Sequence, residues 1–556
     1  MKTIKNYLYS GVLLILGLFI SCEDIGFLDK TPYSTSSPEN YYRTVKEFET
    51  ALIGCYDAIN MQSVPGRSVG MGTYMYGLQF ILSAGTDELI LNSSAPGGLD
   101  RNHFGIASYG ITTQGIGDFW IAFYVGIMRC NVLLEKASTF EAASEAEGNS
   151  LTQIVAEVRF LRAFFYYHLT SLFGGIPMNT TSYSDSQAAR ESLEVIYTEL
   201  IIPDLLFAEE NLSSTAPFAG RADMWTAKGY LGVIYNYLAA CKRFQAGEEL
   251  NFPLNSFQWV DADQMSEDAK EKLEEVVEDS PYRLIERYDY LFRETTKTHQ
   301  QEECLFTAEY SLVYGGDNYP DVTFIFCPGG NAQVNGGSWG GYRPTVEFAS
   351  SYNREIDIRY AHNITGPYNA NSVIEDIEGV NYYVPSVSTG PTFGNNGTGK
   401  YRHMSPQEKP IPAIASAISV PLLRFADVLL QYAEALYFTG DEIRARTYFT
   451  QVRERVVAED RTVADLDAEY NRDNFIDELL EERSRELCYE SKRRIDLFRF
   501  NRLNDAIMSL DPDAGGPNQR VSELQLNWKS YKIWIPIPLR ETGLNPNLAN
   551  QQNPGY

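Results

Sequence analysis

Along much of this chain, apolar residues recur at steps of three and four positions, a period that places them on one face of an α-helix. In one long stretch the recurring residues are Ile154, Val158, Leu161, Phe165, Leu169 and Leu172. Gly174-Gly175 and Pro177 follow, and such residues end helices. Similar patterns predict two more helices, at Phe119–Lys136 and Ala222–Ala240. We therefore expect a mostly α-helical fold.

A helical hairpin is predicted near the C-terminus, with Pro421 opening its first helix and Gly440-Asp441 forming its turn. In its second helix, Ala445 and Phe449 have the small-residue and aromatic spacing of a tetratricopeptide repeat. One such hairpin cannot bury its apolar face alone, so several should stack. The fold expected is therefore a scaffold of tetratricopeptide-like hairpins.

Residues 304–402 differ from the helical stretches, because they are rich in Gly, Asn, Tyr and Pro. Long loops in a compact protein usually carry function. We expect this segment to form an irregular, loop-rich portion that binds a ligand.

The first residues predict an exported lipoprotein. Lys2 and Lys5 precede an apolar run from Leu8 to Ile20, and Ser21-Cys22 follow. This is the layout of a signal peptide. Cleavage before Cys22 would allow acylation of this cysteine, and several acyl chains anchor a protein stably. The alternative is an ordinary secreted protein in which Cys22 merely adjoins the cleavage site. We expect no second membrane-spanning stretch, so the lipid would be the only anchor.

The charge balance excludes some partners. The formal net charge is −27, and a surface this acidic repels nucleic acid and anionic lipid headgroups. Apart from Cys22, six cysteines occur without metal-ligand spacing, and we expect most of them to be small buried residues. We expect no metal and no cofactor.

Several segments, in order, resemble the SusD/RagB family of outer-membrane nutrient-binding lipoproteins. In the N-terminal half they are Phe27–Pro32, Ala51–Tyr56, Thr86–Glu88, the trio Trp120, Tyr124 and Asn131, Ala156–Tyr166, Phe173–Pro177 and Gly220–Ala222. In the C-terminal half they are Leu423–Leu430, Tyr432–Ala435, Glu482–Glu490, Arg493–Leu497, Ile535–Pro538 and Gln552–Tyr556. Glu23-Asp24 also resemble the surface-export signal of Bacteroidetes lipoproteins.

This resemblance implies a protein without catalytic activity that captures a glycan and passes it to a SusC-type TonB-dependent transporter. It implies a signal peptide over residues 1–21, an N-terminal SusD-like region over 22–270 and a C-terminal region over 271–556. The charged clusters Lys492–Arg494 and Glu157–Arg162 are expected to form ion pairs within the scaffold.

Loop aromatics are the candidate ligand-binding residues, because aromatic rings stack on the apolar faces of sugars. The first candidates are Trp339, flanked by glycines, and Tyr314 and Tyr319 in a second glycine-rich loop. Tyr109 and Phe104 join them because their region reaches the ligand in relatives. For each of these residues the alternative is that the ring is buried between a loop and the body of the protein.

Three other functions are alternatives to glycan capture. A secreted glycoside hydrolase needs two carboxylates about 5–10 Å apart in a cleft, which a sequence with 73 acidic residues cannot single out. A tetratricopeptide scaffold for protein partners fits poorly with the aromatic loops and the lipid signal. Uptake of peptides instead of glycans remains open.

Overall fold

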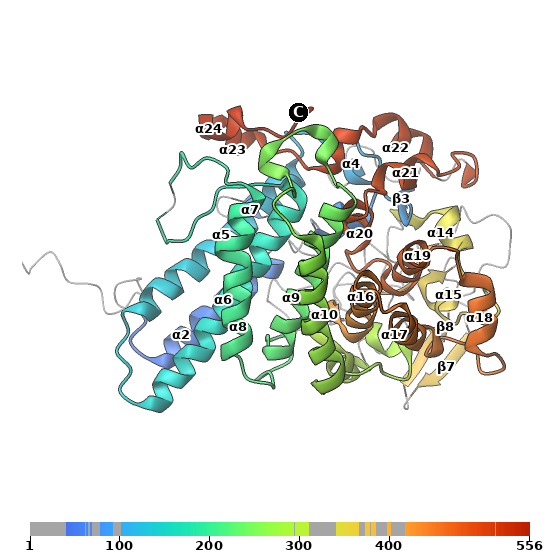
Figure 1. Cartoon of the computed structure of the whole chain (residues 1–556), viewed down its shortest axis with the longest axis horizontal. Helices are drawn as coiled ribbons and strands as arrows, with labels where there is room; N and C mark the ends of the chain where they lie inside the picture. The colour runs from blue at the N-terminus through green and yellow to red at the C-terminus, as the bar shows by residue number, and fades with distance from the viewer. Residues whose placement is uncertain are drawn as a thin grey trace, which may run out of the picture.

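The structure of the chain is a computed structural model, shown in Figure 1. The residues it describes are 41–61, 63–64, 67–68, 78–92, 102–183, 185–293, 295–310, 341–365, 373–377, 380–384, 397–401, 418–516 and 519–556.

The longer helices are α2 Val45–Asp57, α5 Gln114–Ser138, α6 Glu145–Phe173, α8 Ile202–Asn211, α9 Met224–Arg243, α10 Ala262–Asp279, α16 Phe425–Phe438, α17 Glu442–Glu454, α18 Val463–Tyr470 and α19 Phe475–Leu487. The shorter helices are α3 Gln79–Ser83, α4 Asn102–Gly105, α7 Leu193–Ile196, α11 Gln300–Glu303, α14 Val346–Ser350, α15 Arg359–Asn363, α20 Arg493–Arg499, α21 Leu503–Met508, α22 Val521–Asn527, α23 Leu539–Leu544 and α24 Pro546–Asn550. The strands are β1 Ser63–Val64, β2 Arg67–Ser68, β3 Leu89–Leu91, β4 Cys304–Ala308, β5 Tyr342–Pro344, β6 Ile364–Thr365, β7 Val373–Ile377, β8 Val380–Val384, β9 Gly397–Thr398 and β10 Val420–Arg424.

The helices form one continuous stack. In chain order, α2, α5, α6, α8, α9, α10, α16 and α17 each pack against the next (Figure 1). Within it, α17 carries Ala445 and Phe449 into the core, where both are buried. This arrangement confirms the predicted mostly α fold, because each hairpin buries its apolar face against its neighbour.

The helices predicted from the apolar period alone occur where that period placed them. α5 and α6 extend beyond the predicted residues at both ends, whereas α9 begins at Met224 and ends at Arg243. The longest, α6, starts at the N-cap Ser144 and ends at Gly174, whose φ is +75°. A side chain at Gly174 would also clash, because its Cβ would lie 2.0 Å from Oδ1 of Asn255. Glycine therefore ends α6 for two reasons, backbone conformation and space.

One predicted element was wrong. Pro421 does not open a helix, because Val420–Arg424 form strand β10, which pairs antiparallel with β4. All five residues of β10 are buried, so their apolar run has no period that would distinguish strand from helix. The expected boundary between residues 270 and 271 falls inside the continuous helix α10.

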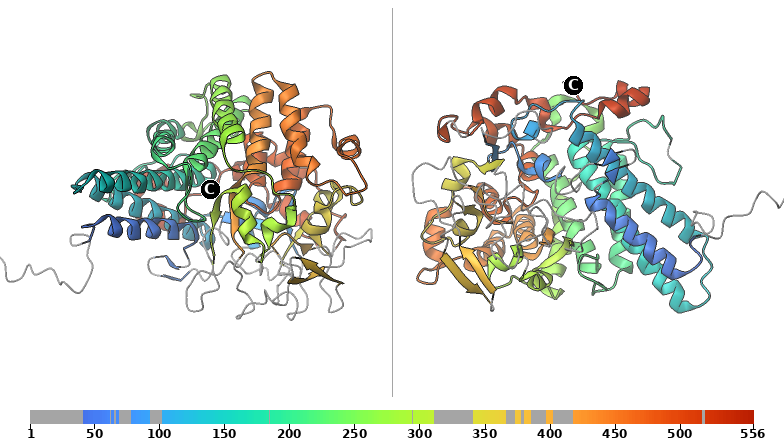
Figure 2. Two further views of the ribbon diagram at one scale, coloured as in Figure 1. Left: turned by 90° about the horizontal axis from the view of Figure 1, so that it is seen from below. Right: turned by 180° about the vertical axis from the view of Figure 1, so that it is seen from behind.

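The strands form two-stranded antiparallel pairs, β1 with β2, β3 with β5, β4 with β10, β6 with β9 and β7 with β8. In the left view of Figure 2, α16 and α17 project to one side of the molecule, and α2 and the β7–β8 hairpin lie towards the other.

Buried ion pairs join the C-terminal elements. Arg424 donates to Glu486 at 2.6 Å, to Glu490 at 2.8 Å and to Glu303 at 3.0 Å. Arg493 pairs with Asp87, and Arg162 pairs with Asp204 at 2.7 Å. The charged clusters of the sequence therefore belong to the scaffold, as predicted, and removing one partner of such a buried pair is costly.

Two further expectations concern membranes and cysteines. In length and composition α5 could cross a membrane, which corrects the expectation that no second stretch would. It packs against α2 and α6, as a core helix of a folded domain does. Cys55, Cys130, Cys241, Cys304 and Cys488 are free and buried, as expected, whereas Cys327 lies outside the described residues.

Candidate functional site

The first-choice aromatic residues Trp339, Tyr314 and Tyr319 lie outside the described residues, as does Cys22. Their roles as ligand-binding residues and as the lipid attachment point stay predictions.

Tyr109 and Phe104 are described, and both are only 3% exposed. The Tyr109 hydroxyl donates to the carbonyl of Lys532 at 2.9 Å and accepts from Arg494 at 3.2 Å. The Phe104 ring packs beside it, with ring centroids 5.5 Å apart. These two rings fill the core between a loop and the body of the protein, so the structure offers neither as a surface for sugar.

An exposed aromatic ring that the sequence analysis did not select is Phe218, in the loop between α8 and α9. Its side chain is 70% exposed. On one side of it lies a hollow of about 340 Å³ bounded by the end of α2 and the end of β4. On the other side lies a hollow of about 300 Å³ bounded by Pro281, Tyr282 and α11. We call Phe218 with these two hollows the Phe218 site.

A buried ion pair holds the Phe218 loop in place. Arg221 donates two hydrogen bonds of 2.5 Å to the carboxylate of Glu157 and a third, also 2.5 Å, to Glu49. The Tyr56 hydroxyl donates to Glu157 at 2.6 Å and accepts from the Ala222 amide at 3.0 Å. Burial raises the pKa of Glu157, although Arg221 opposes this. A bidentate arginine–carboxylate pair fixes the relative orientation of its two partners, so the loop carrying Phe218 is preorganised.

Gly220 brings the same loop close to β4. Its φ is +78°, and a Cβ at this position would lie 2.5 Å from Cγ of Glu309. Glu309 in turn accepts from Thr307 at 2.6 Å and from Ser419 at 2.7 Å, and Lys297 lies 3.4 Å away. The wall between the two hollows is therefore a fixed contact between Gly220 and Glu309.

The composition of the Phe218 site suits an uncharged ligand with apolar faces. Phe218 and Ile53 expose apolar surface, and the nearby carboxylates have partners, since Asp57 pairs with Arg129 at 3.0 Å and Asp223 accepts from Tyr282 at 2.9 Å. Within the described part of the chain, no group of three or more His, Cys, Asp or Glu is placed to hold a metal ion. Carboxylates that are already paired can accept hydroxyl hydrogen bonds but attract a cation weakly.

Comparison with known proteins identifies the class. A family model described as the SusD family matches residues 302–556, and one described as starch-binding associating with outer membrane matches residues 27–235. The chain belongs to the SusD family. It is 26% identical to SusD-like protein P2 of Formosa agariphila, covering 99% of this chain and 100% of that one, and 24% identical to SusD-like protein P25 of the same organism, covering 98% of both.

Solved structures share the fold. A SusD homolog from Bacteroides thetaiotaomicron matches with a TM-score of 0.71 at 20% identity, covering 94% of this chain and 99% of that one. A laminarin-binding SusD-like protein matches with a TM-score of 0.66 at 21% identity, covering 93% and 100%. The surface glycan-binding protein A from Bacteroides fluxus matches with a TM-score of 0.66 at 18% identity, covering 92% and 99%.

Proposed function

We propose that this protein captures a glycan at the surface of the outer membrane and passes it to a SusC-type TonB-dependent transporter. It does so as a binding protein without catalytic activity, anchored by lipid on Cys22. The observation that carries the proposal is the match of SusD family models to both halves of the chain. The family description that names starch binding and the outer membrane supports it, as do structural neighbours named for binding laminarin and surface glycan.

The Phe218 site supports glycan over a basic peptide as the ligand. Phe218 offers a broad apolar face, and sugars present apolar C–H faces to such rings. The carboxylates around it already have protein partners, so they offer little free negative charge to lysine or arginine side chains. Trp339 and Tyr314 are the further aromatic contacts that we propose, and Tyr314 follows the buried Tyr310 at the edge of the site by four positions.

Titration of the soluble chain, beginning at Glu23, with a panel of polysaccharides and peptides tests the ligand class. We expect binding to at least one glycan. Phe218→Ala and Trp339→Ala should each weaken this binding about tenfold or more, a loss of about 1.4 kcal/mol in binding free energy. Leu526→Ala is the matched control, because Leu526 is 74% exposed and lies outside both hollows. Binding of peptides but of no glycan would overturn the proposal.

A further inference from the structure

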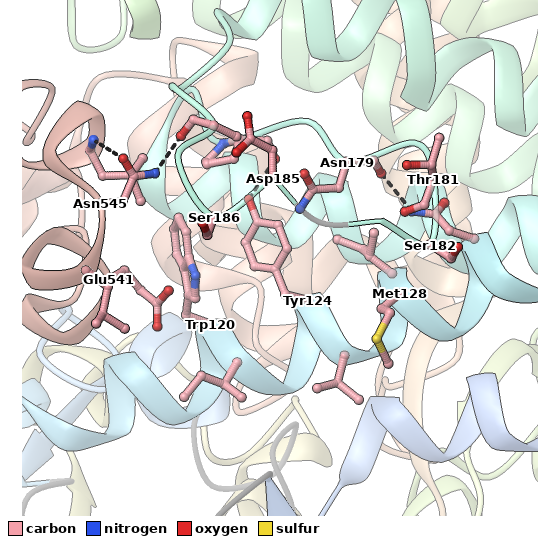
Figure 3. A pocket seen from close by; sticks show the side chains of 18 residues that line it. Trp120, Tyr124, Met128, Asn179, Thr181, Ser182, Asp185, Ser186, Glu541 and Asn545 are labelled. Carbon is pink, nitrogen blue, oxygen red and sulfur yellow. Dashed lines mark hydrogen bonds between the residues drawn. The ribbon is translucent and has the colours of Figure 1, made fainter. Parts of the chain in front are cut away.

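A second pocket, which shares no lining residue with the Phe218 site, lies between α5, the loop after α6 and the C-terminal helices α23 and α24 (Figure 3). Its volume is about 360 Å³, at the small end of the roughly 300–1,000 Å³ typical of small-molecule sites. Trp120, Tyr124 and Met128 line it from α5, and Glu541 and Leu544 line it from α23. We call it the Trp120 groove.

The walls of the Trp120 groove are fixed by hydrogen bonds. The Tyr124 hydroxyl donates to the carbonyl of Pro177 at 2.8 Å. Asn131 donates to the carbonyls of Asn179 and Thr181 at 2.9 and 3.0 Å. On the opposite side, Asn545 donates to the carbonyl of Ala188 at 2.7 Å. The loop of residues 177–188 is therefore tied both to α5 and to the C-terminal helices, and the groove between them is preformed.

Glu541 gives the groove its chemical character. Its side chain is partly buried beside Trp120 (Figure 3), and its carboxylate makes no hydrogen bond or ion pair with any residue that the structure describes. Burial raises its pKa. Its oxygens remain accessible to solvent, so a ligand that donates hydrogen bonds to Glu541 meets an acceptor that no described residue occupies.

The rest of the lining narrows the class of ligand. The 18 lining residues include the carboxylates of Glu541 and Asp185 but no lysine or arginine. An anionic ligand would meet negative charge without a compensating cation. The lining also combines exposed apolar surface, with Met128 45% and Leu544 69% exposed, with the hydroxyls of Thr181, Ser182 and Ser186. Apolar faces beside hydroxyl and carboxylate groups match a sugar ring.

We infer that the Trp120 groove is a second carbohydrate-binding site, which holds a short uncharged or amino-bearing saccharide and excludes uronates and sulfated sugars. This inference rests on the proposed function in taking the ligand to be a glycan. It adds a separate site whose lining comes from α5, the 177–188 loop and the C-terminal helices. A long glycan held at the Phe218 site and a terminal unit held in the Trp120 groove would give the protein two contacts with one polymer, and linked contacts raise avidity.

Calorimetric titration of three classes of trisaccharide tests the inference. The uncharged class is built from glucose, galactose, mannose or xylose, the cationic class from glucosamine and the anionic class from galacturonate. They are added to the soluble chain beginning at Glu23 and to its Phe218→Ala/Trp339→Ala variant, in which the first site is disabled. We expect that variant to retain binding of an uncharged or cationic trisaccharide and to bind the anionic one at least tenfold more weakly.

Two substitutions then locate the retained site. Met128→Trp fills the groove and should abolish the retained binding, and Glu541→Gln should weaken it about tenfold. Met508→Trp is the matched control, since Met508 is an exposed methionine at 51% and lies outside the groove; it should leave binding unchanged.

The possible failures are distinguishable. If the wild-type chain binds a trisaccharide and the Phe218→Ala/Trp339→Ala variant binds none, the inference is overturned and the proposed function stands. Equal binding of the galacturonate trisaccharide overturns the proposed selectivity. If the wild-type chain binds no glycan at all, both proposals fail.

Discussion

Arg162 donates a hydrogen bond of 2.9 Å to Oδ1 of Asn131, joining α6 to α5 at a buried position. The amide of Asn131 donates in turn to two carbonyls of the loop that follows α6. One side chain, 1% exposed, thus links two helices and the rim of the Trp120 groove, and all of its polar atoms are used.

Asn131→Leu should therefore destabilise the protein by about 2–4 kcal/mol, because it leaves buried partners of Asn131 unsatisfied. Asn131→Asp keeps the acceptor for Arg162 but turns a carboxylate oxygen towards the two loop carbonyls, so we expect it to lower stability as well. Calorimetric unfolding of both variants measures the difference. Equal melting temperatures for Asn131→Leu and the wild type would show that this link contributes nothing.

Glu88 predicts a particular pH dependence of stability. Its carboxyl is 1% exposed, and burial raises its pKa from 4.5 to about 8, although the Tyr489 amide donates to it. The folded state therefore holds a proton on Glu88 at pH values where the unfolded state has lost it. Its contribution to stability is fully present below about pH 4.5 and is lost as the pH rises to about 8.

Glu88→Gln should remove this loss, because the glutamine carbonyl can still accept from Tyr489 and carries no charge. The variant should gain melting temperature relative to the wild type at about pH 8.5 and little at about pH 5, as followed by thermal unfolding across that range. A gain that is the same at both pH values would contradict the raised pKa.

Comparing alanine substitutions at Gly220 and Gly440 distinguishes backbone strain from a clash with a neighbouring side chain. Gly220→Ala should both strain the backbone and push Glu309 away, because φ is +78° and the new Cβ would lie 2.5 Å from Cγ of Glu309. We expect lower stability, by about 1 kcal/mol or more, and weaker glycan binding at the Phe218 site. Gly440→Ala is the control, since φ there is +90° but no atom lies within 4 Å; it should lower stability without changing binding. Unchanged glycan binding by Gly220→Ala would show that the contact between Gly220 and Glu309 does not shape the Phe218 site.

Arg190 holds the C-terminal segment. It is 3% exposed, and it donates to Asn553 at 2.9 Å, to Asn255 at 3.0 Å and to the carbonyl of Phe173 at 2.9 Å. Lysine cannot reproduce such a fork of donors, so Arg190→Lys should release residues 551–556 and speed their removal by carboxypeptidase. Digestion at the wild-type rate would contradict this role.

The helices were predictable because their apolar faces repeat over many residues. α6, α9 and α5 occur where that period placed them. β10 was not predictable, since Pro421, Leu422 and Leu423 are apolar on both faces of the strand. What fixes them as a strand is pairing with β4, more than a hundred positions earlier, and a local pattern cannot contain that partner.

The candidate site was harder to predict for the same reason. The contacts that bury Tyr109 come from Arg494 and Lys532, which are 385 and 423 positions away along the chain. Phe218 did carry a usable signal, an aromatic residue among Ala, Pro and Gly in Ala216–Gly220. That is the reasoning applied to Trp339. Gly220–Ala222 resemble the family only as a short segment, and that resemblance contains no information about the exposed ring before them.

Capture of labelled polysaccharide by intact cells tests the proposed role at the cell surface. Cells carrying the full chain are compared with cells carrying Cys22→Ala, Phe218→Ala/Trp339→Ala or the control Leu526→Ala, using the glycan that binds the soluble chain. The first two variants should lose surface binding and uptake, because one lacks its anchor and the other its aromatic contacts, while Leu526→Ala should keep both. Normal binding and uptake in cells carrying Cys22→Ala or Phe218→Ala/Trp339→Ala would contradict the proposed role.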